Sequence, residues 1–200
     1  MISQPLKLGF LASGNGSSAR AIVAAIGAGD LAAEARLLVS NNRSAAALTF
    51  AAEAGVPALC IATQADPEAA DARLAESMAA HGVEWLVLSG YLRHLGPKTL
   101  ARYAGRVLNI HPGPLPRFGG HGMYGQRVHE AVIAAGVAES GICIHLVDEV
   151  YDRGPVLARR SAPVVAGDTA ESLEARVTAL EPQFYVETLR RIAQGEIVLP

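Results

Sequence analysis

The stretch LKLGFLASGNGSSARAIVAAI (residues 6–26) contains three patterns in succession. Residues 6–12 form an apolar run typical of a buried strand, residues 13–19 form a glycine-rich turn, and residues 17–26 have an alanine-rich helical pattern. A strand that leads through a tight turn into a helix is the first half of a βαβ unit, in which successive strands run parallel. The stretch therefore predicts a parallel sheet covered by helices.

The same alternation continues along the chain. Helices are expected over residues 44–54 and 67–81, because each segment opens on a residue type that favours a helix start, Ser or Pro. The further strand-like runs are ARLLVSN (residues 35–41), PALCIA (57–62), WLVLSG (85–90) and VLNIH (107–111). The sequence thus predicts an α/β fold with a doubly wound, mostly parallel sheet and a Rossmann-like N-terminal part.

The pattern changes near the C-terminus. Two strand-like runs, residues 141–147 and 156–165, are separated only by DEVYDRG, which predicts a β-hairpin. Asp168 and the three residues after it resemble a helix start of the capping-box type, and a long C-terminal helix is expected from there towards Ala193. We expect one domain over residues 1–200, divided into a Rossmann-like part over 1–112 and a loop, hairpin and helix over 113–200.

Composition and charge narrow the function classes. The chain has 200 residues, of which 50% are apolar, and this supports one globular domain with a core. A formal charge of −2 with interspersed signs favours neither nucleic acid nor a membrane surface as partner. The start MISQPLKLGF is unlike a signal peptide, so a cytoplasmic location is expected. Cys60 and Cys143 lack metal-ligand spacing and are expected to be buried, reduced thiols, and no metal site is expected.

The glycine-rich turn is compatible with three interpretations. Gly14 and Gly16 allow an anion such as phosphate to approach the backbone at a helix N-terminus. The spacing of Gly14, Gly16 and Ala19 also fits a dinucleotide fingerprint, and Arg43 could then contact the extra phosphate of NADP. Alternatively, the glycines serve only to make a tight turn. The motif alone does not decide between these interpretations of the turn. It leaves open a phosphate-binding enzyme, an NADP-dependent reductase and a non-enzymatic nucleotide-binding module as functions of the protein.

Polar residues at the end of the run 107–111 indicate acyl transfer. Alternation places Asn109 and His111 on the same side of this strand, and Asp152 follows the first hairpin strand, from where it could approach His111. An amide N–H and an imidazolium together suit a carbonyl oxygen that becomes negatively charged. Since no Ser or Cys accompanies them in a nucleophile pattern, the acyl group would pass directly to an amine. The alternative is that the amide and the imidazole only satisfy local backbone groups.

Five segments in this order, spanning nearly the whole chain, carry a family resemblance: SGNGSS, LSGYLRHLGP, LNIHPGPLP, DEVYDRGPV and RVTALE. The chain resembles the phosphoribosylglycinamide formyltransferase family. The resemblance implies transfer of formyl from 10-formyltetrahydrofolate to the amine of glycinamide ribonucleotide, with these two small molecules as partners. It leaves open a monomer or a homodimer. Another folate-dependent formyltransferase, acting on a different amine, is the alternative, because such enzymes share the trio matched by Asn109, His111 and Asp152.

The resemblance also implies roles for individual residues. Asn109, His111 and Asp152 match the catalytic trio, in which Asp152 raises the pKa of a proton-donating His111. The residues that match the substrate site are Gly16, Ser17 and Ser18 for phosphate and Glu181 for ribose. Folate would be held by Leu92, Arg93, His94, Leu95 and Asn109 and by Asp148, Glu149, Val150, Tyr151 and Asp152. The chain departs from the family pattern at Ser18, Thr178 and Pro67 and in a longer loop after His111.

Overall fold

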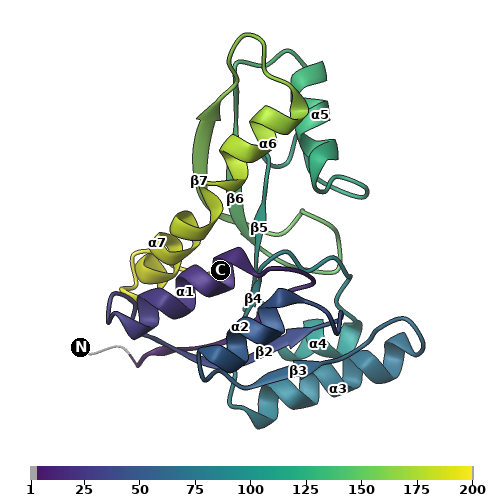
Figure 1. Ribbon diagram of the computed structural model, residues 1–200, viewed down its shortest axis with the longest axis vertical. Coiled ribbons are helices and arrows are strands. Elements are labelled where there is room, and N and C mark those ends of the chain that lie inside the picture. Colours follow the sequence, from purple (N-terminus) through teal and green to yellow (C-terminus); the bar gives the residue numbers. More distant parts are fainter. Residues whose placement is uncertain (1–3, 200) are drawn as a thin grey trace.

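The computed structural model describes residues 4–199; residues 1–3 and 200 of the predicted domain lie outside this range. Seven strands within it form one sheet in the order β3-β2-β1-β4-β5-β6-β7 (Figure 1). The strands are β1 (Leu6–Leu11), β2 (Ala33–Ser40), β3 (Ala58–Cys60), β4 (Trp85–Leu88), β5 (Val107–His111), β6 (Glu139–Leu146) and β7 (Val156–Pro163). Strands β1 to β5 pair in parallel, whereas β6 and β7 are antiparallel. The predicted doubly wound sheet with a C-terminal hairpin is confirmed.

Helices connect the strands. They are α1 (Ser17–Gly27), α2 (Ala46–Glu53), α3 (Pro67–Ala80), α4 (Pro97–Arg102), α5 (Gln126–Ala134), α6 (Ala170–Thr178) and α7 (Glu181–Ala193). The start of α3 shows why its prediction succeeds: the Asp66 carboxylate accepts a hydrogen bond from the Ala69 N–H, and Pro67 occupies the first turn. Helices α4 and α5 were not predicted from the sequence.

The predicted C-terminal helical segment consists of α6 followed by the longer α7. Helix α6 begins with a capping box, one residue later than the pattern at Asp168 predicts: the side chains of Thr169 and Ser172 each accept a hydrogen bond from the backbone N–H of the other. Pro182 lies in the first turn of α7, and because proline has no N–H, it cannot donate to the carbonyl of Thr178. The helical hydrogen bonding is therefore interrupted between the two helices.

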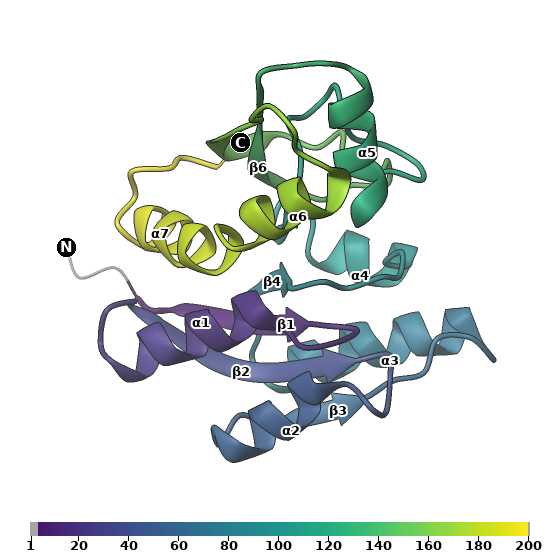
Figure 2. The ribbon, with the colours of Figure 1, turned by 45° about the horizontal axis from the view of Figure 1, so that its top comes forward.

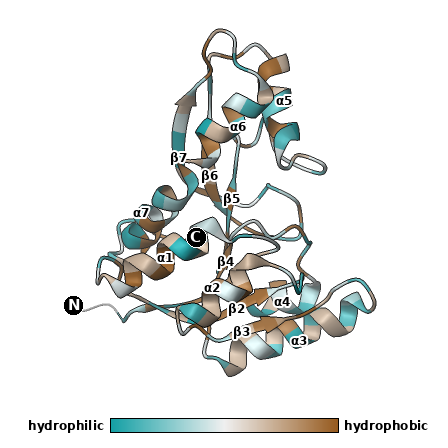
Figure 3. Ribbon diagram, in the orientation of Figure 1, coloured by the Kyte–Doolittle hydropathy of each residue, from teal (hydrophilic) through white to brown (hydrophobic). Residues whose placement is uncertain are grey.

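Apolar side chains fill both faces of the sheet. On one face, α1, α2, α5, α6 and α7 pack on a cluster that includes Phe10, Leu108 and Ile144. On the other face, α3 and α4 cover a cluster around Leu37 and Leu86. Figure 2 shows these layers, and Figure 3 shows hydrophobic residues along the central strands. Cys143 is buried and Cys60 only partly so, which corrects the expectation for Cys60; both thiols are free.

The last helix is tied to the strand that ends in His111. Helix α7 packs against α1 (Figure 2), and the Arg190 Nε donates to the Asp30 carbonyl over 3.0 Å. The hydroxyl of Tyr185, a fully buried α7 residue, donates to the Leu108 carbonyl of β5 over 2.8 Å. Burial raises the pKa of Tyr185 well above its ordinary value, so this hydroxyl stays a donor.

No helix among residues 4–199 is long and apolar enough to cross a membrane.

Candidate active site

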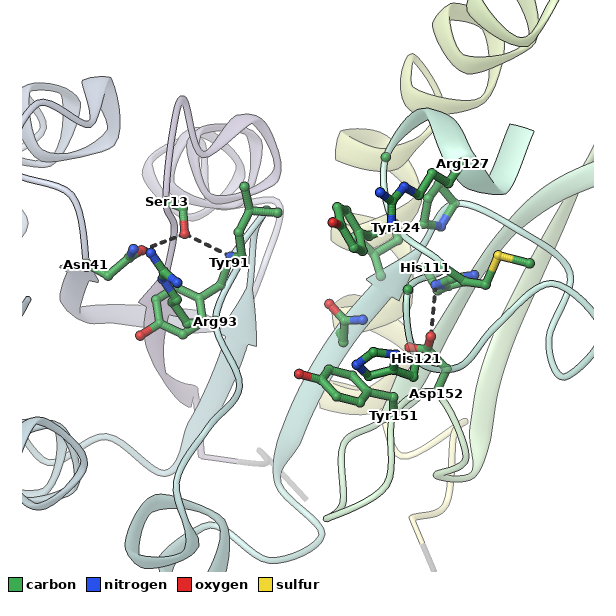
Figure 4. Close-up of a pocket in the computed structure, with 18 of the residues that line it drawn as sticks. Ser13, Asn41, Tyr91, Arg93, His111, His121, Tyr124, Arg127, Tyr151 and Asp152 are labelled. Carbon is green, nitrogen blue, oxygen red and sulfur yellow. Dashed lines mark hydrogen bonds and ion pairs between the residues drawn. The ribbon is translucent and has the colours of Figure 1, made fainter. Parts of the chain in front are cut away.

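A cavity of about 1020 Å³ opens at the carboxyl ends of the parallel strands. Ligands of open α/β sheets bind at this edge, because loops diverge there and leave a crevice. In Figure 4, Ser13, Asn41, Tyr91 and Arg93 form one side, whereas His111 and Asp152 belong to the opposite side. The cavity is also lined by Arg43, Leu92, Asn109, His121, Tyr124, Arg127, His129, Tyr151, Glu174, Thr178 and Glu181.

The structure brings Asp152 to His111, as the sequence predicts. The imidazole of His111 is almost fully buried, and its Nε2 lies 2.7 Å from the Phe118 carbonyl. Because a carbonyl can only accept, Nε2 carries the N–H. The other nitrogen, Nδ1, faces the Asp152 carboxylate at 3.6 Å, and this carboxylate also accepts the Gly120 N–H at 2.9 Å. The loop after β5 therefore contacts both the imidazole and its acid.

The pKa of His111 differs from the expectation. Burial lowers this pKa from its ordinary value of 6.5, and the two influences that raise it, the Asp152 charge and the hydrogen bond to Phe118, are smaller. Asp152 thus acts in the expected direction, but the expected net increase is wrong. The cause is desolvation, which the sequence pattern does not report. In the free protein at neutral pH, His111 is therefore largely a neutral imidazole with its N–H on Nε2.

His145 of β6 is a further member of this cluster. Its Nδ1 lies 2.9 Å from the Leu146 carbonyl and therefore carries the N–H, so Nε2 is left to accept a hydrogen bond from Asn109 Nδ2 at 3.1 Å. The same Nε2 lies 3.5 Å from Asp152. Asn109 and His145 are direct partners in the β5–β6 register, so the correct hairpin register would have revealed the contact. His145 fixes the orientation of the Asn109 amide.

The predicted phosphate turn has a clear structural role. Gly16 adopts a left-handed conformation with φ of 65°, and a Cβ at this position would lie 3.1 Å from the Cβ of Ala47 in α2. The Ala19 N–H already donates to Ser89 Oγ at 3.1 Å. Ser17 is exposed, Ser18 is buried, and the start of α1 has no side-chain cap. Ser13, the first residue of this turn, lines the cavity. Gly16, Ser17 and Ser18, which follow it, do not.

The residues assigned to folate are only partly brought together. Leu92, Arg93 and Tyr151 line the cavity with Asn109 and Asp152. The other five do not line it: His94, Leu95, Asp148, Glu149 and Val150.

Two ring and backbone contacts hold the loops that carry these residues. The ring of His94 contacts that of Tyr151, with centroids 4.8 Å apart, and thereby joins the loop after β4 to the loop after β6. The Leu92 N–H donates to Ser13 Oγ at 2.8 Å, which fixes the loop after β4 against the end of β1. The two loops at the cavity mouth are therefore linked to each other and to the sheet.

Glu181, the residue assigned to ribose, lies in the cavity wall at the start of α7. Burial, with a smaller contribution from the neighbouring charge of Glu174, raises the pKa of Glu181 to about 7. The carboxyl group is therefore close to half protonated at neutral pH, and ligand hydroxyls that donate to it would favour the ionised form.

Among residues 4–199, no group of three or more His, Cys, Asp or Glu side chains could hold a metal ion.

Comparison with known proteins identifies the family of the chain. A sequence profile described as "Formyl transferase" matches residues 6–189. The chain belongs to this formyltransferase family. One relative, the chloroplastic phosphoribosylglycinamide formyltransferase of Vigna unguiculata, is 39% identical over 194 residues, which cover 96% of the chain and 62% of the relative. The chain thus spans a little under two thirds of this plant relative.

Bacterial relatives match over most of their length. The phosphoribosylglycinamide formyltransferase of Mycobacterium tuberculosis is 37% identical over 96% of the chain and 86% of the relative. The crystal structure of glycinamide ribonucleotide transformylase 1 from Symbiobacterium toebii is 33% identical, covers 98% of the chain and 92% of that protein, and has a TM-score of 0.89. The formyltransferase resemblance seen in the sequence is therefore confirmed, together with the fold that it implies.

Proposed function

We propose that the protein transfers a formyl group from 10-formyltetrahydrofolate to the primary amine of 5-phosphoribosylglycinamide, a step of de novo purine biosynthesis. One observation carries the proposal: an amide donor and an imidazole are held side by side by partners from β6 and from two loops, at one end of a cavity. Small-molecule sites commonly occupy 300–1,000 Å³. At about 1020 Å³, the cavity is large enough for an amine substrate and a reduced folate together.

In the proposed reaction, the amine nitrogen attacks the formyl carbon, and the carbonyl oxygen gains negative charge as the C=O π bond opens. Asn109 Nδ2 has two N–H groups; His145 accepts one and leaves the other to stabilise this oxygen. The amine gives up one proton as the C–N bond forms, and N10 of the folate takes one proton as its bond to the formyl carbon breaks. His111, neutral in the free protein, accepts the first proton and, as the imidazolium that Asp152 stabilises, delivers a proton to N10. The new bond is a C–N amide bond.

The substrates are placed by the residues around the trio. The uncapped start of α1, at Gly16, Ser17 and Ser18, suits the substrate phosphate, since its free N–H groups and the helix dipole favour an anion. Glu181 would accept the ribose hydroxyls. The loops of residues 92–95 and 148–152 would hold the folate, through Leu92, Arg93, Tyr151 and Asp152, which line the cavity, and largely through backbone groups.

An assay of the wild-type protein tests the proposed function. Purified protein is incubated with glycinamide ribonucleotide and 10-formyltetrahydrofolate, and N-formyl product is measured by mass spectrometry alongside tetrahydrofolate by absorbance. We expect equal amounts of the two products. Formation of tetrahydrofolate and free formate without formylated ribonucleotide would contradict the proposal, because water would then be the acceptor.

Asp152→Asn should lower the pKa of His111 further, because it removes the charge that favours the imidazolium. We expect turnover at neutral pH to fall about tenfold for each pKa unit lost, with little change in substrate affinity. The His111 ring protons, followed by NMR against pH, give the pKa directly. Asp30→Asn, an exposed and remote change, is the control. Identical His111 titrations in the variant and the wild type would exclude Asp152 as its electrostatic partner.

A further inference from the structure

Three buried histidines lie in or beside the site, and they differ in their hydrogen bonds. His111 contacts Phe118 and Asp152, and His145 contacts the Leu146 carbonyl and Asn109, so both ring nitrogens of each have a polar neighbour. His129 of α5 is fully buried, yet neither of its ring nitrogens has a hydrogen-bond partner among residues 4–199. It is also part of the cavity wall. Of the cavity-lining side chains that the structure describes, only His129 carries buried polar atoms without a partner.

An unpaired buried imidazole costs free energy of folding, because both nitrogens lose their hydrogen bonds to water and gain none from the protein. An apolar side chain at this position would avoid the cost, as Val128 and Val132 do on the same helix. Stability therefore does not explain a histidine here. A partner that enters the cavity would explain it, because buried polar groups are paired in functional states.

The neighbours of His129 indicate which form of the ring meets that partner. Burial lowers the pKa of His129, and the nearby His111 ring lowers it further. At neutral pH the ring is neutral, with one N–H that can donate and one nitrogen lone pair that can accept. An amide group carries the complementary pair, a carbonyl that accepts and an N–H that donates.

The position of His129 in the wall indicates which substrate carries that amide. Helix α5 packs against α6, and α6 with the start of α7 brings Glu174, Thr178 and Glu181 to the same cavity. Glu181 is the residue proposed for the ribose. The folate residues, in contrast, belong to the loops after β4 and β6. His129 thus lies on the side of the amine substrate.

We propose that His129 binds the amide of the glycinamide group and so positions the attacking amine beside Asn109 and His111. This inference rests on the proposed function and adds a specificity-determining residue to it. It makes a distinctive prediction, because a residue kept for ligand binding and a residue kept for folding respond to substitution in opposite ways. Two substitutions separate the roles: His129→Leu removes both polar groups, and His129→Gln retains a donor and an acceptor.

The test measures thermal unfolding and ligand affinity. We expect free His129→Leu to melt at or above the wild-type temperature, while its Kd for glycinamide ribonucleotide rises at least tenfold and its Kd for tetrahydrofolate stays unchanged. Ribose 5-phosphate, which lacks the amide, should bind the variant and the wild type equally. His129→Gln should retain more affinity for glycinamide ribonucleotide than His129→Leu. His81→Leu, which removes a histidine that bonds the Ser77 carbonyl far from the cavity, is the matched control.

Several outcomes would overturn the inference. A destabilised His129→Leu with wild-type affinity for glycinamide ribonucleotide would make His129 structural, and an equal loss for ribose 5-phosphate would assign it to another part of the substrate. If His129→Leu fails to fold, His129→Gln decides the matter. Wild-type melting with a partly reduced affinity for glycinamide ribonucleotide supports the inference, and wild-type affinity with lowered melting overturns it. Absence of formyl transfer by the wild type would instead contradict the proposed function, which keeps the two failures distinct.

Discussion

Asn109→Leu is expected to lower turnover by about 10² to 10³, the usual cost of removing one donor from an oxyanion site. The substitution keeps the approximate volume of the side chain and removes the N–H groups that the amide offers to His145 and to the cavity. Because the hydroxyl of Tyr185 still anchors β5 through the neighbouring Leu108 carbonyl, the fold should persist. Single-turnover rates at saturating substrate measure the loss directly, and circular dichroism checks the fold.

Two further variants separate the loss of the Asn109 N–H from the loss of its orientation. Asn109→Asp retains the shape but has no N–H in its ionised form, so it should be as slow as Asn109→Leu. His145→Phe keeps the amide of Asn109 and removes the acceptor that orients it, so its loss should be smaller. Near-wild-type turnover in folded Asn109→Leu would show that the amide serves only the contact with His145.

Glu181→Gln should stabilise the free protein at alkaline pH. The pKa of this carboxyl group rises from 4.5 to about 7 on folding, so the folded state binds its proton more tightly than the unfolded state. Wild-type stability should therefore fall as pH increases from 4.5 through 7, by about 3 kcal/mol in all. Glutamine has no charge to bury, so the variant should match the wild type near pH 4 and exceed it near pH 8.

Urea unfolding at pH 4, 6 and 8 measures this difference. Glu53→Gln changes an exposed carboxylate at the end of α2 and serves as the control. The stabilised Glu181→Gln protein should at the same time bind ribose phosphates more weakly, since an amide is a poorer acceptor for hydroxyls than a carboxylate. A constant stability difference across this pH range would show that Glu181 is not the group that titrates.

The sequence predicts the fold well because its strongest signals are local. The runs that became β1, β2, β4 and β5 are short, mostly apolar and bounded by turns, and the run 67–81 has both an N-cap and an N1 proline. The break near Pro182 has an equally local cause, and it separates two helices within one helical pattern. Helix α5 was missed because it follows a loop rich in proline and glycine and has no side-chain cap.

The site is less predictable because its properties arise from packing between distant segments. Alternation along β5 places Asn109 and His111, but the contacts of His145 depend on the register of β6, and the pairing of His111 with Phe118 depends on the path of a loop. The lowered pKa of His111 and the raised pKa of Glu181 both come chiefly from burial. Charge partners can be proposed from a sequence, whereas loss of solvent requires the assembled structure.

The contact between α1 and α7 joins the first helix within residues 4–199 to the last one there. During synthesis, residues 17–27 leave the ribosome on the order of ten seconds before residues 181–193, at typical elongation rates. Throughout that interval the apolar face of α1, including Ile22, lacks the side chains of α7 that cover it in the finished protein. We therefore expect the nascent chain to be a substrate for chaperones and to complete its core only after α7 has left the ribosome. A stop codon that removes α7 should yield aggregates in place of a smaller folded product.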